Sequence, residues 1–74
     1  MIPIPNNTKV IVTAENNQKF KGKILNSGTQ AQVLMYAVLL DEPENYPGIE
    51  TGVKVVEVPF DKVNFDIEAL RDTI

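Results

Sequence analysis

The stretch QAQVLMYAVLLDEP, residues 30–43, contains eight consecutive apolar residues, from Val33 to Leu40. Side chains alternate between faces along a β-strand, so both faces of a strand here would be apolar. A helix over residues 30–42 is the alternative, because Gln, Ala, Leu and Met favour helices and Thr29 would cap one. The apolar residues form no helical stripe, and an unbroken apolar run between turn signals is typical of a strand buried on both sides. We therefore predict a strand.

Two apolar faces on one strand raise the question of what covers the second. A chain of 74 residues builds only one small core. Without cysteine it has no disulfide, and without histidine it offers no zinc site of nitrogen or sulfur ligands, which leaves oligomerisation as the remaining support. We expect the second face to be covered partly by the C-terminal segment and partly by another subunit. We assign to that face Leu34, Tyr36, Val38 and Leu40.

The charge of the chain is unevenly distributed. The net charge is −3, but residues 1–40 hold four lysines against one glutamate, and residues 41–74 hold three basic residues against nine acids. The halves therefore carry +3 and −6. This asymmetry is compatible with an ordinary solvated surface, with head-to-tail self-association, or with a basic face that binds a polyanion.

Several functional classes are disfavoured by what the sequence lacks. The N-terminus has no signal-peptide pattern, and the longest apolar run is far shorter than the roughly 20 residues of a membrane span. We expect a soluble, cytoplasmic protein with no membrane partner. Without His or Cys a nucleophilic triad is ruled out, apart from rarer lysine-based variants. Pairs of carboxylates such as Asp41 and Glu42, or Asp61 and Asp66, lie in no pocket-forming context. We predict no enzyme, no cofactor, no metal and no small-molecule substrate.

Four further short strands are predicted from β-branched runs and alternation. They cover residues 9–14, 19–25, 53–58 and 63–65, with turns at 15–18 and 26–29. In the second strand Phe20, Gly22 and Ile24 point inward and the intervening lysines point outward. Asp66 is expected to cap a final helical segment. One face of that segment would hold Ile67, Leu70 and Ile74.

This layout predicts an all-β fold, a small, strongly bent five-stranded barrel with a short C-terminal helix. A flat sheet of this size would leave its edges exposed. Gly22 fits a barrel because a glycine in mid-strand lets the strand bend sharply. The loop at residues 41–52, with two prolines, two glycines and four acids, is expected to be exposed, mobile and free of metal, because its spacing does not match a calcium loop.

The segment NQKFKGKILNS, residues 17–27, resembles the first motif of Sm-like proteins, which include the bacterial Sm-like RNA chaperone. Its apolar–x–Gly–x–apolar core is Phe20, Gly22 and Ile24. Divergent Sm-like proteins of marine cyanophages are similar, and SH3-like barrels share the layout. The resemblance implies an Sm-like or SH3-like barrel that forms a homo-oligomer, a ring, and binds single-stranded RNA.

The chain departs from the Sm-like pattern at several positions. Gly28 and Gln32 stand where the family has an Asp and an Asn of the RNA pocket, and Gln30 lies near its base-stacking aromatic position. Residues 58–62 replace the second motif, and the usual N-terminal helix is missing. These departures affect the expected RNA binding more than the expected fold, and a structural or adaptor module that binds itself or another protein is the alternative function.

The alternating lysines of residues 19–23 are the strongest functional signal. Alternate residues of a strand lie on one face about 6.5–7 Å apart, close to the phosphate spacing of an extended single strand. The alternative is that these lysines only keep an exposed strand soluble. Polar residues that follow could supply hydrogen bonds to base edges. The predicted site for single-stranded RNA or DNA consists of Lys19, Lys21, Lys23, Asn26, Thr29, Gln30, Gln32 and Lys62. The acidic half would have to face away from it.

Overall fold

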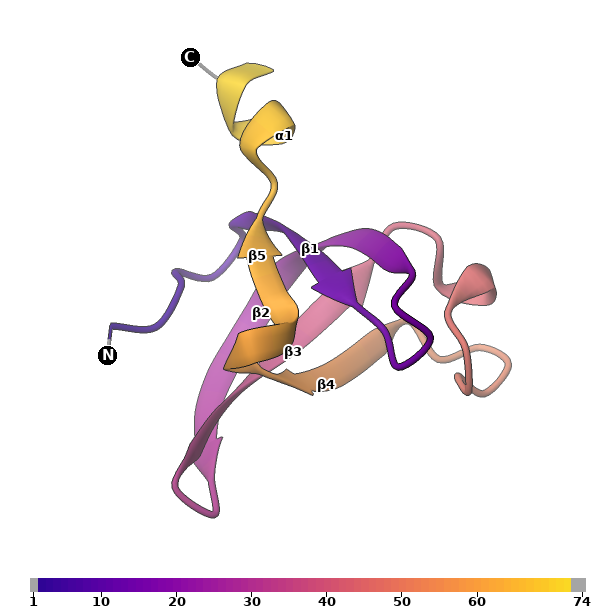
Figure 1. Ribbon diagram of the computed structural model, residues 1–74, viewed down its shortest axis with the longest axis horizontal. Helices are drawn as coiled ribbons and strands as arrows, with labels where there is room; N and C mark the ends of the chain where they lie inside the picture. Colours follow the sequence, from indigo (N-terminus) through magenta and orange to yellow (C-terminus); the bar gives the residue numbers. More distant parts are fainter. Residues whose placement is uncertain (1, 73–74) are drawn as a thin grey trace.

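Five antiparallel strands form one open sheet in the order β4-β3-β2-β1-β5 (Figure 1). The computed structural model describes residues 2–72. The strands are β1 Lys9–Thr13, β2 Lys19–Gln30, β3 Val33–Leu40, β4 Val55–Pro59 and β5 Val63–Phe65. Two 3₁₀ turns, η1 Pro43–Asn45 and η2 Phe60–Lys62, and the helix α1 Ile67–Asp72 complete the described elements. The prediction of a strand rather than a helix after residue 30 is confirmed.

The expected closure into a barrel is not observed. β4 and β5 lie at opposite ends of the strand order, and neither pairs with the other. β4 passes into β5 through η2, where Pro59 adopts φ −70° and provides no N–H for a ladder. The sheet is bent, but among the described residues its two outer edges have no strand partner.

The core lies on one face of this sheet, which we call the inner face. Its fully buried side chains are Val10, Val12, Ile24 and Val38, from β1, β2 and β3. Phe20 packs against this cluster, and Gly22 is buried within β2, so the predicted inward alternation of β2 is confirmed. A Cβ atom at Gly22 would lie 2.5 Å from the carbonyl oxygen of Leu39, so only glycine allows β2 and β3 to approach this closely.

The assignment of the two faces of β3 is corrected by the structure. Tyr36, Val38 and Leu40, expected to need cover from another subunit, are 2%, 0% and 4% exposed and belong to the core itself. The opposite, outer face of β3 carries the partly or largely open side chains, Val33, Met35, Ala37 and Leu39. Sequence alternation identified two apolar faces but could not tell which one the remaining strands cover.

The hairpin of β2 and β3 is longer than predicted. Residues 26–29, predicted as a turn, continue β2 in extended form and pair with β3, while the turn lies at Ala31 and Gln32 with φ of 51° and 67°. Two central residues with positive φ define a type I′ hairpin turn, which normally requires Asn or Gly. Gly28 misled the prediction, because it lies in a strand without positive φ.

A β-bulge interrupts this hairpin at Leu25. The register shifts there, so that Ile24 pairs with Val38 but Asn26 pairs with Ala37. Because paired residues share a face, the even positions of β2 point inward before the bulge and outward after it. Asn26 and Gly28 therefore lie on the outer face.

Both ends of the described chain leave the sheet, the N-terminal one after a contact with the core and the C-terminal one as a helix. Near the N-terminus Ile4 packs on the core and donates its N–H to the Tyr36 hydroxyl at 2.9 Å. At the other end the Asp66 carboxylate accepts a hydrogen bond from the Ala69 N–H at 3.2 Å, which confirms the predicted cap of α1. α1 projects away from the sheet (Figure 1), and Ile67 is 63% exposed. Among the described residues this segment does not cover β3; the side chain of Leu70 and all of Ile74 lie outside what the structure describes.

Candidate nucleic-acid interface

Four lysines share the outer face of the hairpin formed by β1 and β2. The register pairs Lys9 with Lys23, Ile11 with Lys21 and Thr13 with Lys19. Because Val10 and Val12 point inward, these alternate positions point outward. The predicted stripe of three lysines is thus extended by Lys9, and we call this surface the lysine face: Lys9, Lys19, Lys21 and Lys23.

Lys9 was missed because it lies ten residues before the stripe. The turn that joins the strands brings it back, since the Ala14 N–H bonds to the Gln18 carbonyl at 2.9 Å and Asn17 adopts φ 66°. The predicted turn at residues 15–18 would have paired residue 9 with residue 24 on the inner face, whereas the observed register places residue 13 opposite residue 19 and residue 9 opposite residue 23. Lys9 and Lys23 are directly opposite each other, and like charges in this position destabilise a sheet. A bound anion would reduce this repulsion.

The polar residues of the predicted site are divided between two faces. Asn26 and Gln30 pair with Ala37 and Val33 on the outer face, whereas Thr29 pairs with Leu34 on the inner face. Gln32 lies in the hairpin turn, and Lys62 lies in η2 rather than on the sheet. Of the polar residues predicted, only Asn26 and Gln30 extend the outer face along β2.

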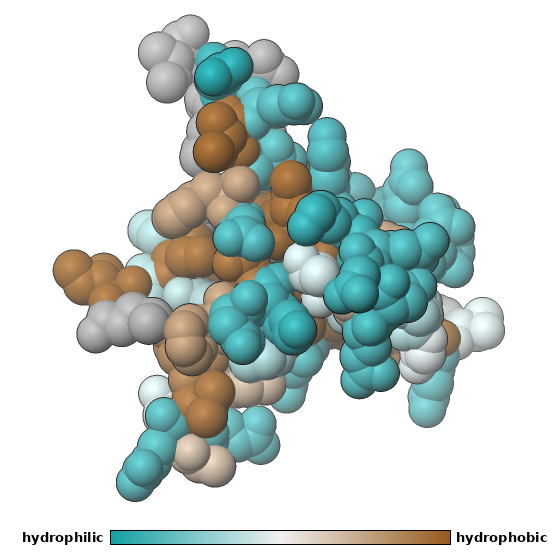
Figure 2. All heavy atoms as spheres, in the orientation of Figure 1, coloured by the Kyte–Doolittle hydropathy of each residue, from teal (hydrophilic) through white to brown (hydrophobic). Residues whose placement is uncertain are grey.

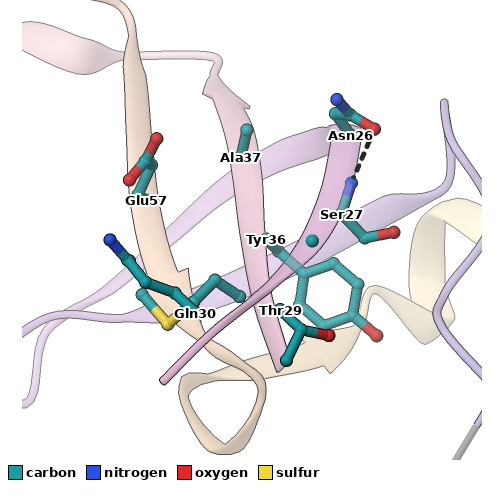
Figure 3. Close-up of a pocket in the computed structure, with 9 residues that line it drawn as sticks. Asn26, Ser27, Thr29, Gln30, Tyr36, Ala37 and Glu57 are labelled. Carbon is teal, nitrogen blue, oxygen red and sulfur yellow. Dashed lines mark hydrogen bonds between the residues drawn. The ribbon is translucent and has the colours of Figure 1, made fainter. Parts of the chain in front are cut away.

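A hollow of about 330 Å³ opens over the outer part of the hairpin. Figure 3 shows Asn26, Ala37 and Glu57 directed to one side of the sheet, with Tyr36 and Thr29 directed to the other. A Cβ atom at Gly28 would meet no other atom within 4 Å, so the glycine leaves this space empty. Nine residues line the hollow: Asn26, Ser27, Gly28, Thr29, Gln30, Met35, Tyr36, Ala37 and Glu57.

The acidic loop does not face away from the lysines, contrary to expectation. The Asp41 N–H bonds to the Lys21 carbonyl at 3.0 Å, and Asp41 and Glu42 line a hollow of about 360 Å³ together with Lys19, Phe20 and Lys21. Hydrophilic side chains gather over this loop and the nearby turn (Figure 2). Two carboxylates therefore lower the positive potential at one end of the lysine face.

An aromatic contact holds the same loop against the sheet. The rings of Phe20 and Tyr46 lie 5.0 Å apart between centroids, at an angle of 54°. The pKa of the Tyr46 phenol is raised above its usual value, first by burial and then by the nearby Glu15 carboxylate. Most residues of the loop are exposed, as predicted, but Tyr46 and Ile49 pack on the core and anchor the loop at two points.

Residues 2–72 contain no group of three His, Cys, Asp or Glu side chains that would hold a metal ion. No helix among them is long and apolar enough to cross a membrane. The sequence matches no protein-family model, no curated protein and no solved structure.

Proposed function

We propose that this chain is a non-enzymatic, Sm-like β-barrel module that assembles into a homo-oligomeric ring and binds single-stranded nucleic acid, preferably RNA. The observation that carries the proposal is the lysine face, where four cations project from one side of a two-stranded hairpin. The five-stranded antiparallel order and the buried glycine at the bend of β2 support the kinship.

The lysine face suits an extended polyanion. Its lysines follow β2 at intervals of about 6.5–7 Å, and Lys9 lies on the neighbouring strand. Three or four neutralised phosphates predict a log–log salt slope of roughly −2 to −3 for each subunit, at about −0.7 per phosphate. We expect the protein to prefer single strands, because their base edges are free to contact the protein, whereas a duplex hides them.

Assembly is supported by the two open edges of the sheet. β4 and β5 each present backbone groups with no strand partner among the described residues. Antiparallel pairing of β4 from one copy with β5 from the next would satisfy both edges, and a repeated contact of this kind forms a ring when the rotation from copy to copy closes. The exposed side chains of Val55 and Phe65, 37% and 51% exposed, lie on these edge strands.

The same open edges favour a second candidate function, a structural or adaptor module. In that case the edges pair with another copy or a protein partner, and the lysine face only keeps the sheet soluble. The two functions differ in one measurable property, which is whether the purified protein binds an oligonucleotide.

The deciding experiment is a titration of fluorescently labelled single-stranded RNA at about 50 mM salt, followed by anisotropy. Lys21→Ala should weaken all sequences about equally and make the salt slope shallower by about 0.7. Lys54→Ala, a matched loss of charge next to β4, should change the slope much less. No binding at tens of micromolar protein would reject the nucleic-acid function and favour the adaptor.

Light scattering on a sizing column tests the assembly separately. A multimer at micromolar concentration is expected. A monomer under these conditions would reject the ring.

A further inference from the structure

The hollow on the outer face is framed by a row of three directly paired residues. Asn26 pairs with Ala37, and Ala37 pairs with Glu57, so an amide and a carboxylate flank a methyl group. Neighbouring strands lie about 4.8 Å apart, which places the two polar residues about 9–10 Å apart at the backbone. The next row holds Gly28 opposite Met35. The floor is therefore flat and apolar, and its two walls are polar.

The dimensions and lining of this hollow suit a planar ring with a polar edge. The face of a nucleobase lying over Ala37 and Gly28 would contact Met35, and the edge of the ring would reach Glu57 or Asn26. The Glu57 carboxylate only accepts hydrogen bonds, so the ring edge that meets it must donate.

The hollow also continues the path of the lysine face. Toward β1, the outer-face pair next to Asn26 and Ala37 is Lys23 with Leu39. Lys21 is the next outward residue of β2 in the same direction. A single strand whose phosphates follow these lysines would carry a base over the hollow at its next or second step.

We propose that this hollow is a nucleobase subsite that accepts bases with an exocyclic amino group and rejects uracil. The proposal rests on the proposed function for the path of the strand. Glu57 accepts from the amino group, and Gly28 keeps the space free. On the opposite wall the Asn26 Oδ1 accepts from the Ser27 N–H at 2.9 Å, which leaves its Nδ2 to donate to an acceptor at the far edge of the ring. Cytosine and uracil provide the sharpest contrast, because the two pyrimidines differ at position 4 by a donor against an acceptor.

The first test compares oligo(C) with oligo(U) of equal length at neutral pH. We expect oligo(C) to bind about tenfold more tightly, since one good base contact contributes discrimination of this order. Glu57→Gln should remove most of the preference, because an amide both donates and accepts. Glu44→Gln removes the same charge from an exposed position outside the hollow and should leave the ratio of the two affinities unchanged.

A second variant fills the hollow without disturbing the backbone. Gly28→Leu places its side chain where no atom lies within 4 Å of the Cβ, and Gly28 does not need positive φ. The variant should keep its circular dichroism spectrum and its salt slope but lose the preference for oligo(C). Equal binding of both oligomers by the native protein, with a slope that depends on Lys21, would overturn the subsite and leave the proposed function standing.

Free nucleosides separate the subsite from the lysine face, because they carry no phosphate. At millimolar concentration, cytidine should shift the NMR amide signals of Gly28, Ala37 and Glu57 more than uridine does, and Gly28→Leu should abolish this difference. Such shifts in a protein that binds no RNA would support the subsite and reject the proposed function. Identical responses to both nucleosides would overturn the subsite.

Discussion

The two halves of β2 belong to one strand but lie in different surroundings. Residues 19–23 pair with β1 and residues 22–24 pair with β3, and their inward side chains join the core. Residues 26–30 extend past β1, pair only with β3 and are mostly exposed. We call them the base half and the tip half. The base half therefore builds the fold, and the tip half is free to contact other molecules.

The largest expected difference concerns side-chain burial. Ile24→Ala in the base half removes a side chain that is 0% exposed, and should lower the free energy of unfolding by about 2–5 kcal/mol. Leu34→Ala, opposite Thr29 of the tip half, removes a half-buried side chain and should cost clearly less. Urea unfolding measures both, and equal costs would contradict the division of β2.

The two glycines of β2 provide the next test. Gly22→Ala should lower the free energy of unfolding by about 1–3 kcal/mol, because its Cβ would lie 2.5 Å from the Leu39 carbonyl oxygen and 2.8 Å from Val38 Cγ1. Gly28→Ala meets no atom and should be neutral, or stabilising by up to about 1 kcal/mol through the unfolded chain. Thermal unfolding of the two variants side by side checks this pair, and a costly Gly28→Ala would show that the tip half is packed after all.

The turn of the tip half should be open to improvement. Ala31 and Gln32 both adopt positive φ, which side chains other than Asn, Asp and Gly take up unfavourably. Replacing them together by Asn and Gly should raise the free energy of unfolding by roughly 1 kcal/mol. A variant with Ala31→Val, which is β-branched, should move the melting temperature the opposite way. If both variants melt like the native protein, the turn carries no strain.

A charge test probes the outer face of the base half. Asp41→Asn with Glu42→Gln should raise the salt concentration at which the protein leaves a heparin column, because both carboxylates lie beside Lys19 and Lys21. Glu44→Gln with Glu50→Gln changes the net charge equally but lies outside that hollow, and should raise it less. Equal shifts for the two pairs would mean that only net charge matters.

The smallest effect concerns Tyr46, which packs on Phe20 of the base half. Its pKa is raised, so the folded state holds the phenol proton more tightly than the unfolded chain does. This contribution to the free energy of unfolding is therefore fully present below the ordinary tyrosine pKa of about 10 and is lost as the pH rises above that value. Glu15→Gln should lower the pKa of Tyr46 slightly, as read from its ring signals by NMR, whereas Glu44→Gln should leave it unchanged. A pKa unaffected by Glu15→Gln would leave burial as its only cause.

Local patterns predicted the base half well. The alternation of Phe20, Gly22 and Ile24 identified the inner face, and the capping role of Asp66 followed from its side chain. The tip half was mispredicted because its turn uses Ala31 and Gln32, which carry no turn signal, while Gly28 carries a misleading one.

The remaining misses concern contacts between residues distant in sequence. Lys9 joins the lysine face through strand register, and Asp41 reaches Lys21 because β3 returns antiparallel to β2. Glu57 reaches the hollow only through the pairing of β4 with β3. None of these neighbours is visible in a local pattern, because each depends on which residues of two strands are paired. We expected the barrel to close because exposed edges are unfavourable. That rule does not say whether an edge pairs within its own chain or with another chain.

The extra residue at Leu25 has a consequence for how this chain can vary over evolutionary time. Before this residue the even-numbered positions of β2 face the core, and after it the odd-numbered positions do. Substitutions in the tip half can therefore accumulate without reaching the core, whereas loss of this one residue would exchange the two faces of the whole tip at once. A lineage could thus refine what the tip half touches while the core residues of the base half and of the other strands are inherited unchanged.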